Sequence, residues 1–313
     1  MGSMMALRAH TRGGPDVLVY ESAPRPTAGD GEVLIAVSAA AITFDELTWP
    51  ETWVSGGVDR TPVIPSHEFS GVVAQVGDGV TAFTAGDEVY GLVPFDRDGA
   101  AAEYVSVPAT SVAARPRTVS HVVSAAAALP ALTAWEALID HAAVQPGQRV
   151  MVHGGGVGSF VTQLARALGA GVTCTVRAAP DVEYVVARGL ERVINTDQES
   201  LDTETGVFDV VIDAVGRDVP EALFAALRRG GRLITLQEPP SQEMADKHGV
   251  TALFFIVTAE QQHHLARVAD MIDTGSLKVS VAATFPLAEG RNAYKSGAVR
   301  RRYPGKTVLV VRD

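Results

Sequence analysis

The chain has 313 residues, 47% of them hydrophobic and 20% charged, with a formal net charge of -10 at pH 7. This composition is typical of a soluble globular protein long enough for two domains, and the negative charge disfavours nucleic acid and anionic membranes as partners. The single cysteine, Cys174, excludes a disulfide framework and favours a reducing cytosol, and no stretch is expected to be long and apolar enough to span a bilayer.

The first 120 residues are predicted to be mostly strand. Short β-rich runs, separated by turns of Gly, Pro and Asp, lie at 33–37, 71–76 and 87–90. From about 122 to 143 the pattern becomes helical and rich in alanine, and Pro130 and Pro146 mark breaks in it.

Residues 149–160 join a short apolar strand to a cluster of glycines, and the glycines open a helix with apolar residues at helical spacing. Glycine permits a tight turn and close approach of the backbone, while free N–H groups at a helix start attract a pyrophosphate. This layout predicts a dinucleotide site. The match to G-x-G-x-x-G is imperfect, because its third glycine falls on Ser159 when it is read from Gly154, so a plain strand–turn–helix corner stays an alternative.

The next strand is expected at 171–176, and the residue at its end bears on the choice of cofactor. An NAD-binding protein usually has Asp or Glu there to hold the ribose 2′-hydroxyl. Here the residue is Arg177, and the first acid after it is Asp181. A cation suits a 2′-phosphate, which favours NADPH, although a solvated surface arginine is nearly as consistent with this one position.

Further strands at 208–216 and 230–236 alternate with helical stretches, which predicts a parallel, doubly wound sheet that binds ligands at the carboxyl ends of its strands. A helix is expected at 263–272. The last strands, at 280–285 and 307–311, are expected to rejoin the N-terminal sheet. The first domain is then discontinuous.

Several separated segments resemble one protein family. They are residues 13–18, 64–73, 86–91, 101–105, 128–135, 146–150, 254–257 and 305–309. In order and spacing, they resemble the medium-chain dehydrogenase/reductase superfamily, specifically its zinc-free quinone oxidoreductase (zeta-crystallin-like) branch. The resemblance implies an α/β protein with two domains and an active site between them. A GroES-like, mostly-β catalytic domain would comprise residues 1–121 and 276–313, and a Rossmann NADP(H)-binding domain residues 122–275.

The chain departs from the family pattern at two places, and a third position bears on whether it binds a metal. The phosphate loop is about two residues shorter than the usual one, and Thr43 stands where the family often has Asn. His67 and Glu68 resemble the Gly-His-Glu of zinc alcohol dehydrogenases. Catalytic zinc needs three protein ligands, but the first has no counterpart near Thr43 and the third falls in the apolar run 128–130, so no metal is expected.

The resemblance implies hydride transfer from NADPH to a quinone or an α,β-unsaturated carbonyl. Such chemistry needs hydrogen-bond donors for the developing oxyanion more than a strong base. The candidate catalytic residues are Thr43, Asp45 and His67, and the candidate substrate-lining residues are Phe44, Trp49 and Trp53. The alternatives are core packing for the tryptophans, solvated loop carboxylates for Asp45 and Glu46, and a polar core role for His67.

Family position assigns the cofactor contacts. They are Thr133, Gly155, Gly156, Val157, Gly158, Arg177, Ala214, Val215, Gly216, Leu236, Phe255, Ile256 and Val257. A cytoplasmic homodimer, paired through an edge strand of the Rossmann sheet, is expected. The alternatives are an enoyl or enone reductase dedicated to a biosynthetic pathway and a non-catalytic NADPH-binding sensor, with a zinc alcohol dehydrogenase a distant third.

Overall fold

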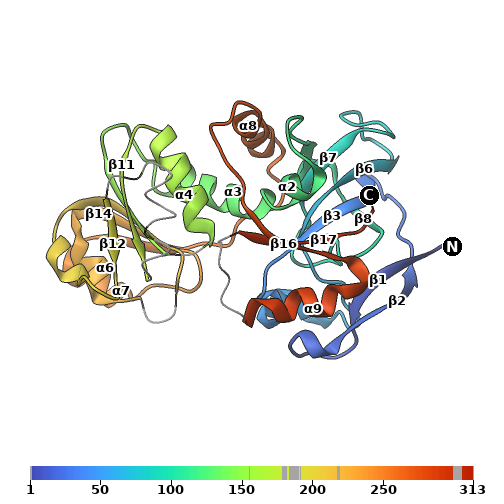
Figure 1. Ribbon diagram of the computed structural model, residues 1–313, viewed down its shortest axis with the longest axis horizontal. Coiled ribbons are helices and arrows are strands. Elements are labelled where there is room, and N and C mark those ends of the chain that lie inside the picture. The colour runs from blue at the N-terminus through green and yellow to red at the C-terminus, as the bar shows by residue number, and fades with distance from the viewer. Residues whose placement is uncertain are drawn as a thin grey trace. The chain divides into compact units, whose positions relative to one another are not determined.

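The computed structural model describes residues 2–154, 156–177, 182, 190, 192–216, 219–298 and 305–312 (Figure 1). They form two compact units, one comprising Met1–Leu129 and Thr258–Asp313 and the other Pro130–Val257. The sequence placed these boundaries after residues 121 and 275. In the structure both α2 (His121–Ala125) and α8 (Gln262–Asp273) belong to the first unit instead. Helix α2 packs on strands of that unit, and the Tyr90 hydroxyl donates to the carbonyl of Leu265 in α8 at 2.6 Å.

The first unit is built on a seven-stranded sheet in the order β16-β17-β3-β6-β7-β9, with β8 also paired to β3. These strands are β3 (Glu32–Ile42), β6 (Glu68–Val76), β7 (Glu88–Leu92), β8 (Tyr104–Pro108), β9 (Val112–Ala114), β16 (Val281–Pro286) and β17 (Lys306–Val310). The antiparallel pairing of β17 with β3 returns the end of the chain to the N-terminal sheet, as the sequence predicts. The smaller elements of the first unit, outside this sheet, are β1 (Ser3–Ala9), β2 (Leu18–Pro24), α1 (Pro50–Trp53), β4 (Val54–Ser55), β5 (Val58–Asp59) and α9 (Gly290–Lys295).

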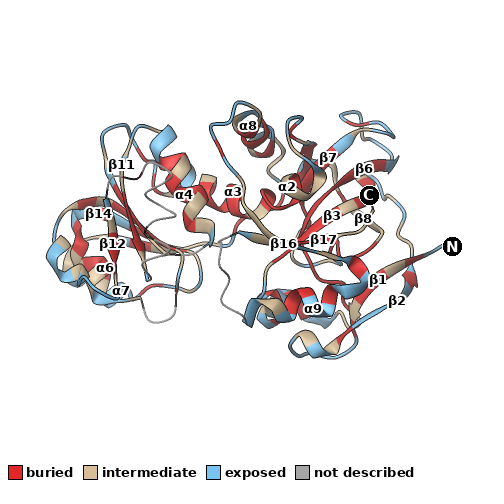
Figure 2. Cartoon of the chain, in the orientation of Figure 1, coloured by how far each residue is buried: buried red, intermediate tan, exposed pale blue. Residues whose placement is uncertain are grey.

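Strand β3 is largely buried along its length (Figure 2), so both of its faces are covered. Val33, Ile35 and Val37 belong to the large core of the unit. Ala39 and Ala41 instead form a small cluster with Ala125 and Ala126, the last of which caps α2. Small side chains on this face let a helix approach closely, so α2 packs on the sheet beside the end of β3.

The second unit holds a six-stranded parallel sheet in the order β12-β11-β10-β13-β14-β15. The strands are β10 (Arg149–His153), β11 (Gly171–Val176), β12 (Arg192–Asn195), β13 (Phe208–Asp213), β14 (Leu227–Thr235) and β15 (Thr251–Phe254). The order reverses between β10 and β13, which is the switch point where doubly wound sheets bind nucleotides. The predicted parallel, doubly wound sheet is therefore confirmed.

Helices cover both faces of this sheet. Met151 and Val211 pack in a cluster with residues of α6 (Glu221–Ala226) and α7 (Gln242–His248). Val152 points to the opposite face because side chains alternate along a strand, and there it meets α4 (Gly156–Ala167). Residues on both faces are therefore apolar, as a parallel sheet requires.

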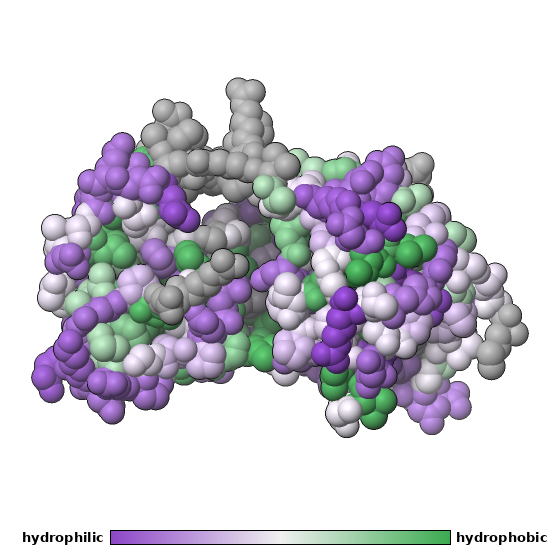
Figure 3. All heavy atoms as spheres, turned by 90° about the horizontal axis from the view of Figure 1, so that it is seen from below, coloured by the Kyte–Doolittle hydropathy of each residue, from purple (hydrophilic) through white to green (hydrophobic). Residues whose placement is uncertain are grey.

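One helical run corrects the expectation that no stretch of the chain is long and apolar enough to span a bilayer. Residues 121–141, which contain α2, α3 (Ala128–Trp135) and a π-helical turn at Glu136–His141, reach the length and hydropathy that a membrane span needs. In the most apolar window of this run 72% of the residues are buried inside the protein, as is usual for the core helix of a soluble protein. On the face drawn in Figure 3, hydrophilic residues are interspersed with apolar ones over both units.

Candidate functional site

The glycine turn after β10 has the geometry of a phosphate cradle. Gly154 adopts φ +62°, and a Cβ there would lie 2.5 Å from Val215 Cγ2. Helix α4 begins at Gly156, and a Cβ on Gly158 would lie 3.2 Å from Val152 Cγ1. Conformation and the contact with Val215 therefore both favour glycine at position 154, and glycine at position 158 lets the helix approach the strand closely. Gly155 lies outside the described residues.

Four polar side chains form a row across the carboxyl end of the parallel sheet. Thr175, His153, Asp213 and Thr235 are register partners on β11, β10, β13 and β14. His153 Nδ1 lies 2.8 Å from Thr175 Oγ1, and burial lowers the pKa of His153. A polar row at the carboxyl edge, beside a turn that favours glycine, suits a dinucleotide.

Asp213 is the buried anchor of this row and was not identified from the sequence. Its Oδ1 accepts hydrogen bonds from the backbone N–H groups of Val215, at 2.9 Å, and Gly216, at 3.3 Å. Its Oδ2 is buried and has no hydrogen-bond partner among the described residues. The aspartate thus fixes the loop after β13 and, within the described part of the chain, keeps one oxygen free to accept a hydrogen bond. With the polar row and the glycine turn, this edge of the sheet fits a dinucleotide.

The structure places the other predicted cofactor residues on the second unit. Arg177 is exposed at the end of β11, and Val157 is half-buried in the first turn of α4. Beyond β13, Ala214 is half-buried, Val215 is exposed and Gly216 adopts φ +64°. The remaining residues lie after β14, after β15 or in α3: Leu236 donates to the Asp213 carbonyl, Phe255 packs on His141, Ile256 is exposed, and Val257 and Thr133 are buried. Their cofactor roles stay predictions.

In the first unit, three neighbouring strands bring a hydroxyl, a carboxylate and an ammonium group together. Thr43 follows the end of β3, Glu68 begins β6, and Lys306 begins β17. The register sets Glu68 opposite Ala41 and sets Thr307, next to Lys306, opposite Ile42. The three polar residues therefore meet at one edge of the sheet, although the sequence separates Lys306 from Thr43 by 263 positions.

Lys306 connects the other two groups. Its Nζ donates to Thr43 Oγ1 at 3.0 Å and forms an ion pair with Glu68 Oε1. Glu68 is 1% exposed and also accepts from the backbone N–H of Leu129 at 3.2 Å. Burial raises the pKa of Glu68, and the charge of Lys306 opposes that effect. Lys306, and therefore the ion-pair partner of Glu68, was not among the residues predicted from the sequence.

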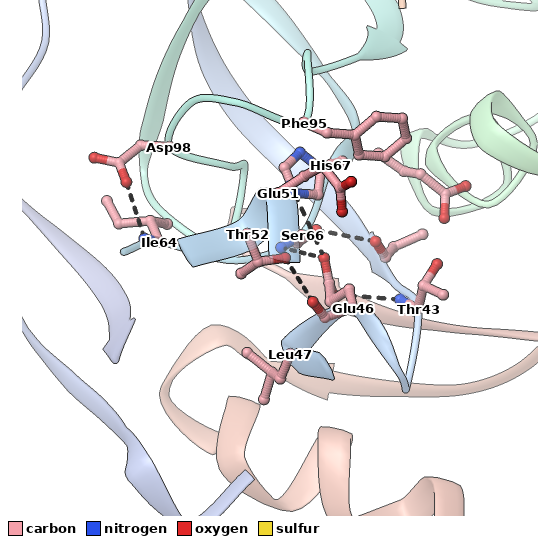
Figure 4. Close-up of polar contacts among 12 residues, drawn as sticks. Thr43, Glu46, Leu47, Glu51, Thr52, Ile64, Ser66, His67, Phe95 and Asp98 are labelled. Atoms are coloured by element: carbon pink, nitrogen blue, oxygen red, sulfur yellow. Dashed lines mark hydrogen bonds and ion pairs between the residues drawn. The ribbon is translucent and has the colours of Figure 1, made fainter. Parts of the chain in front are cut away.

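Glu46 corrects a second prediction, because it is not a solvated loop carboxylate. It is 1% exposed, and burial raises its pKa to about 7 despite hydrogen bonds that favour the charged form. Its Oε1 accepts from the Tyr294 hydroxyl. Its Oε2 accepts from the Ser66 N–H at 2.9 Å, as Figure 4 shows. Tyr294 comes from α9, near the end of the chain, so no local pattern in the sequence could reveal this partner.

Ser66 and His67 form a constrained turn against this glutamate. Ser66 adopts φ +71°, and its hydroxyl donates to the Ala41 carbonyl at 2.9 Å. This left-handed conformation costs a non-glycine residue about 1–2 kcal/mol. His67 Nε2 lies 4.0 Å from Glu46 Oε2, and burial lowers the pKa of His67 to about 4. The imidazole is therefore neutral at pH 7.

Aromatic rings extend the site beyond His67. Phe95 lies 5.0 Å from His67 and 5.6 Å from Trp49, both measured between ring centroids (Figure 4 shows Phe95 beside His67). Arg60 connects the segment that contains Phe95 to helix α1, because its Nη1 donates to the carbonyls of Glu51, Thr52 and Phe95 at 3.0–3.2 Å. Trp49 was among the residues predicted from the sequence, whereas Phe95 was not.

Three other candidates lie apart from these contacts. Trp53 is 3% exposed, belongs to the core and donates from Nε1 to the Leu47 carbonyl at 2.9 Å, which favours the packing interpretation over a substrate-lining role. Phe44 is exposed and packs against Gly297. Asp45 is exposed, and its backbone carbonyl accepts from the Thr48 hydroxyl.

The donor set around His67 does not fit a catalytic zinc ion. Zinc requires three protein ligands, and the described part of the chain contains no group of three His, Cys, Asp or Glu side chains that could hold a metal. The nearby carboxylates are also engaged, Glu68 by Lys306 and Glu46 by Tyr294 and Ser66.

Comparison with known proteins places the chain in a family. The model of the alcohol dehydrogenase GroES-like domain matches residues 29–117, and that of zinc-binding dehydrogenases matches residues 188–309. Human quinone oxidoreductase is 29% identical, with 98% of each chain covered. The 2-haloacrylate reductase of a Burkholderia species is 29% identical, with 93% of this chain and 95% of that protein covered.

A solved structure of a mycobacterial protein complexed with NADPH superimposes with a TM-score of 0.84 at 28% identity, covering 98% of this chain and all of that one. The two domain matches, the full-length relatives and the fold agree with one another. The chain belongs to the medium-chain dehydrogenase/reductase superfamily, with a GroES-like domain and a Rossmann domain, and is an oxidoreductase of that family.

Proposed function

We propose that this protein is a metal-independent, NADPH-dependent reductase of quinones or α,β-unsaturated carbonyl compounds. The observation that carries the proposal is the turn at Gly154, where conformation and the contact with Val215 favour glycine at the switch point of a parallel sheet. A nicotinamide cofactor is the ligand that this arrangement suits best, and two full-length relatives are named as reductases or oxidoreductases.

Arg177 supports NADPH over NADH. It is exposed at the carboxyl end of β11, the strand next to β10, where an acidic residue would select the free ribose hydroxyl. A guanidinium group pairs well with a phosphate and has no carboxylate-like acceptor for a 2′-hydroxyl. A mycobacterial structural relative is complexed with NADPH, which agrees with this choice.

The side chains of the first unit suit a substrate whose oxygen gains negative charge when the substrate accepts a hydride. Bound NADPH supplies the hydride. Thr43 and Lys306 are hydrogen-bond donors at one sheet edge, and His67 is neutral, so the unit offers donors for a developing oxyanion. The relatives' names, quinone oxidoreductase and 2-haloacrylate reductase, describe acceptors of this kind.

Turnover in the presence of a chelator tests the proposed function. Purified protein treated with EDTA is expected to oxidise NADPH with at least one member of a panel of quinones and enones. It is expected to leave NADP⁺ unreduced in the presence of primary and secondary alcohols. Alcohol oxidation that is lost with the chelator and restored by zinc would overturn the proposal. Cofactor binding without turnover on the whole panel would favour a sensor.

Replacement of Arg177 tests the cofactor choice. Because a charge-assisted hydrogen bond is worth about 1.5–3 kcal/mol, Arg177→Ala is expected to weaken NADPH binding by about tenfold or more while changing the Kd for NADH by less than about twofold. Arg228→Ala, which removes a half-exposed arginine near the amino end of β14, is the matched control. Equal losses for both cofactors would remove the specificity argument.

Two expectations about the whole protein are part of this proposal. We expect it to be cytoplasmic. We also expect a homodimer that pairs through an edge strand of the Rossmann sheet, whose edges are β12 and β15. An exposed edge strand offers unpaired backbone groups to a second copy.

A further inference from the structure

We propose that Lys306 is a positioning residue that orients the Thr43 hydroxyl as a hydrogen-bond donor toward the acceptor's carbonyl or quinone oxygen. The inference rests on the proposed function and assigns a role to a residue that the sequence did not single out. It starts from one contact, the donation from Lys306 Nζ to Thr43 Oγ1 at 3.0 Å.

The direction of this hydrogen bond follows from the chemistry of the two groups. An ammonium group has three donors and no acceptor, so Thr43 Oγ1 must accept. The hydroxyl then uses a lone pair on Lys306 and directs its own hydrogen away from the ammonium. A hydroxyl that accepts from a cation also becomes a stronger donor, because hydrogen bonds in a chain polarise one another. Threonine in place of the family's usual asparagine therefore still presents a directed donor.

Glu68 holds the ammonium group in place. It is 1% exposed, pairs with Lys306 and is itself fixed by the Leu129 N–H at 3.2 Å. The lysine side chain is 19% exposed, so most of it is buried beside Glu68 while a small part reaches the surface. The carboxylate balances the positive charge, and Lys306 can polarise Thr43 without leaving an unpaired charge in the interior.

A double-mutant cycle on kcat separates this role from a structural one. Thr43→Val and Lys306→Met are each expected to lower kcat by about tenfold or more, as loss of a directed donor to an oxyanion does. The double variant is expected to be no more than about threefold slower than the slower single variant, because both changes remove the same donor. Thr43→Ser and Lys306→Arg are expected to recover most of the activity.

Controls keep the outcome interpretable. Lys306→Met leaves Glu68 unpaired, so Lys306→Met/Glu68→Gln provides a variant without a buried charge. Lys247→Met removes a surface lysine paired with Glu221 and is expected to leave kcat unchanged. The Kd for NADPH, measured by titration, is expected to change by less than about twofold in every variant, because the loss lies in the chemical step.

The kcat values of these variants decide whether Lys306 positions Thr43. A multiplicative loss in the double variant, or unchanged kcat in Lys306→Met/Glu68→Gln, would overturn the positioning role while leaving the proposed function standing. If the unaltered protein reduces no quinone or enone, the proposed function itself is wrong and the role of Lys306 falls with it. A sub-multiplicative loss with rescue by Lys306→Arg supports it.

Discussion

Glutamine in place of Glu46 is expected to stabilise the protein increasingly as the pH rises, by about 3 kcal/mol between pH 4.5 and 7.5 relative to the unaltered chain. Burial raises the pKa of Glu46 to about 7 from 4.5. Between these values the folded protein holds a proton that the unfolded chain has lost. Raising the pH through this window therefore favours unfolding, and the full penalty is present above about pH 7.

His67 is expected to act in the opposite direction. Its pKa falls to about 4 from 6.5 on burial, so between these values the unfolded chain holds the extra proton. Raising the pH through that window favours the folded protein, and the full contribution is present above pH 6.5. Replacement of His67 by Gln should therefore cost progressively more stability, by about 3 kcal/mol across the window.

Urea unfolding at a series of pH values measures both effects. In the unaltered protein the two slopes oppose each other, so each appears in the difference between a variant and the unaltered chain. Glu51→Gln, at an exposed glutamate of the neighbouring helix, controls for the loss of a carboxylate. Differences that stay flat with pH in Glu46→Gln and in His67→Gln would show that these groups titrate as exposed side chains do.

Alanine at Gly154 is expected to weaken NADPH binding by more than about tenfold and to destabilise the second unit by about 2–4 kcal/mol. The residue adopts φ +62°, which costs an alanine about 1 kcal/mol or more. Its Cβ would also lie 2.5 Å from Val215 Cγ2, so the Val215 side chain, or the loop after β13 that carries it, must move. The turn after β10 and the loop after β13 both belong to the proposed cradle, which explains the coupled loss of affinity.

Gly206→Ala is the matched control for this change. Gly206 adopts φ +69°, and a Cβ there would meet no atom within 4 Å, so the variant carries the conformational cost alone. Adding Val215→Ala to Gly154→Ala removes the clash and should restore part of the stability and affinity. Equal destabilisation by Gly154→Ala and Gly206→Ala, with NADPH affinity intact, would contradict the structural role of this turn.

The Rossmann strands were predictable because their signals are local. The strand expected at 171–176 has those bounds in the structure, and the one expected at 230–236 begins earlier, at Leu227. Apolar β-branched runs separated by helical periods predict a parallel sheet without any knowledge of tertiary contacts. The glycine turn was identified for the same reason, although Gly154 rather than Gly155 is the residue whose constraint the structure describes.

The polar site of the first unit was largely unpredictable for the opposite reason. Glu46 has the sequence context of a loop carboxylate, and its burial depends on Tyr294, 248 positions along the chain. Lys306 reaches Thr43 only because β17 pairs with β3. Likewise, residues 121–141 are a buried helix because the protein surrounds them, whereas composition alone allows a membrane span. The cofactor and catalytic roles assigned from the resemblance remain predictions.

Titration of the purified protein with NADPH and with NADH tests the central claim most directly. The account predicts saturable binding of NADPH at one site per chain, tighter than that of NADH by about tenfold or more because of Arg177. Tighter binding of NADH would contradict the cofactor choice. Failure to bind either dinucleotide would show that the shortened glycine turn no longer forms a cofactor site, and the proposed function would be wrong.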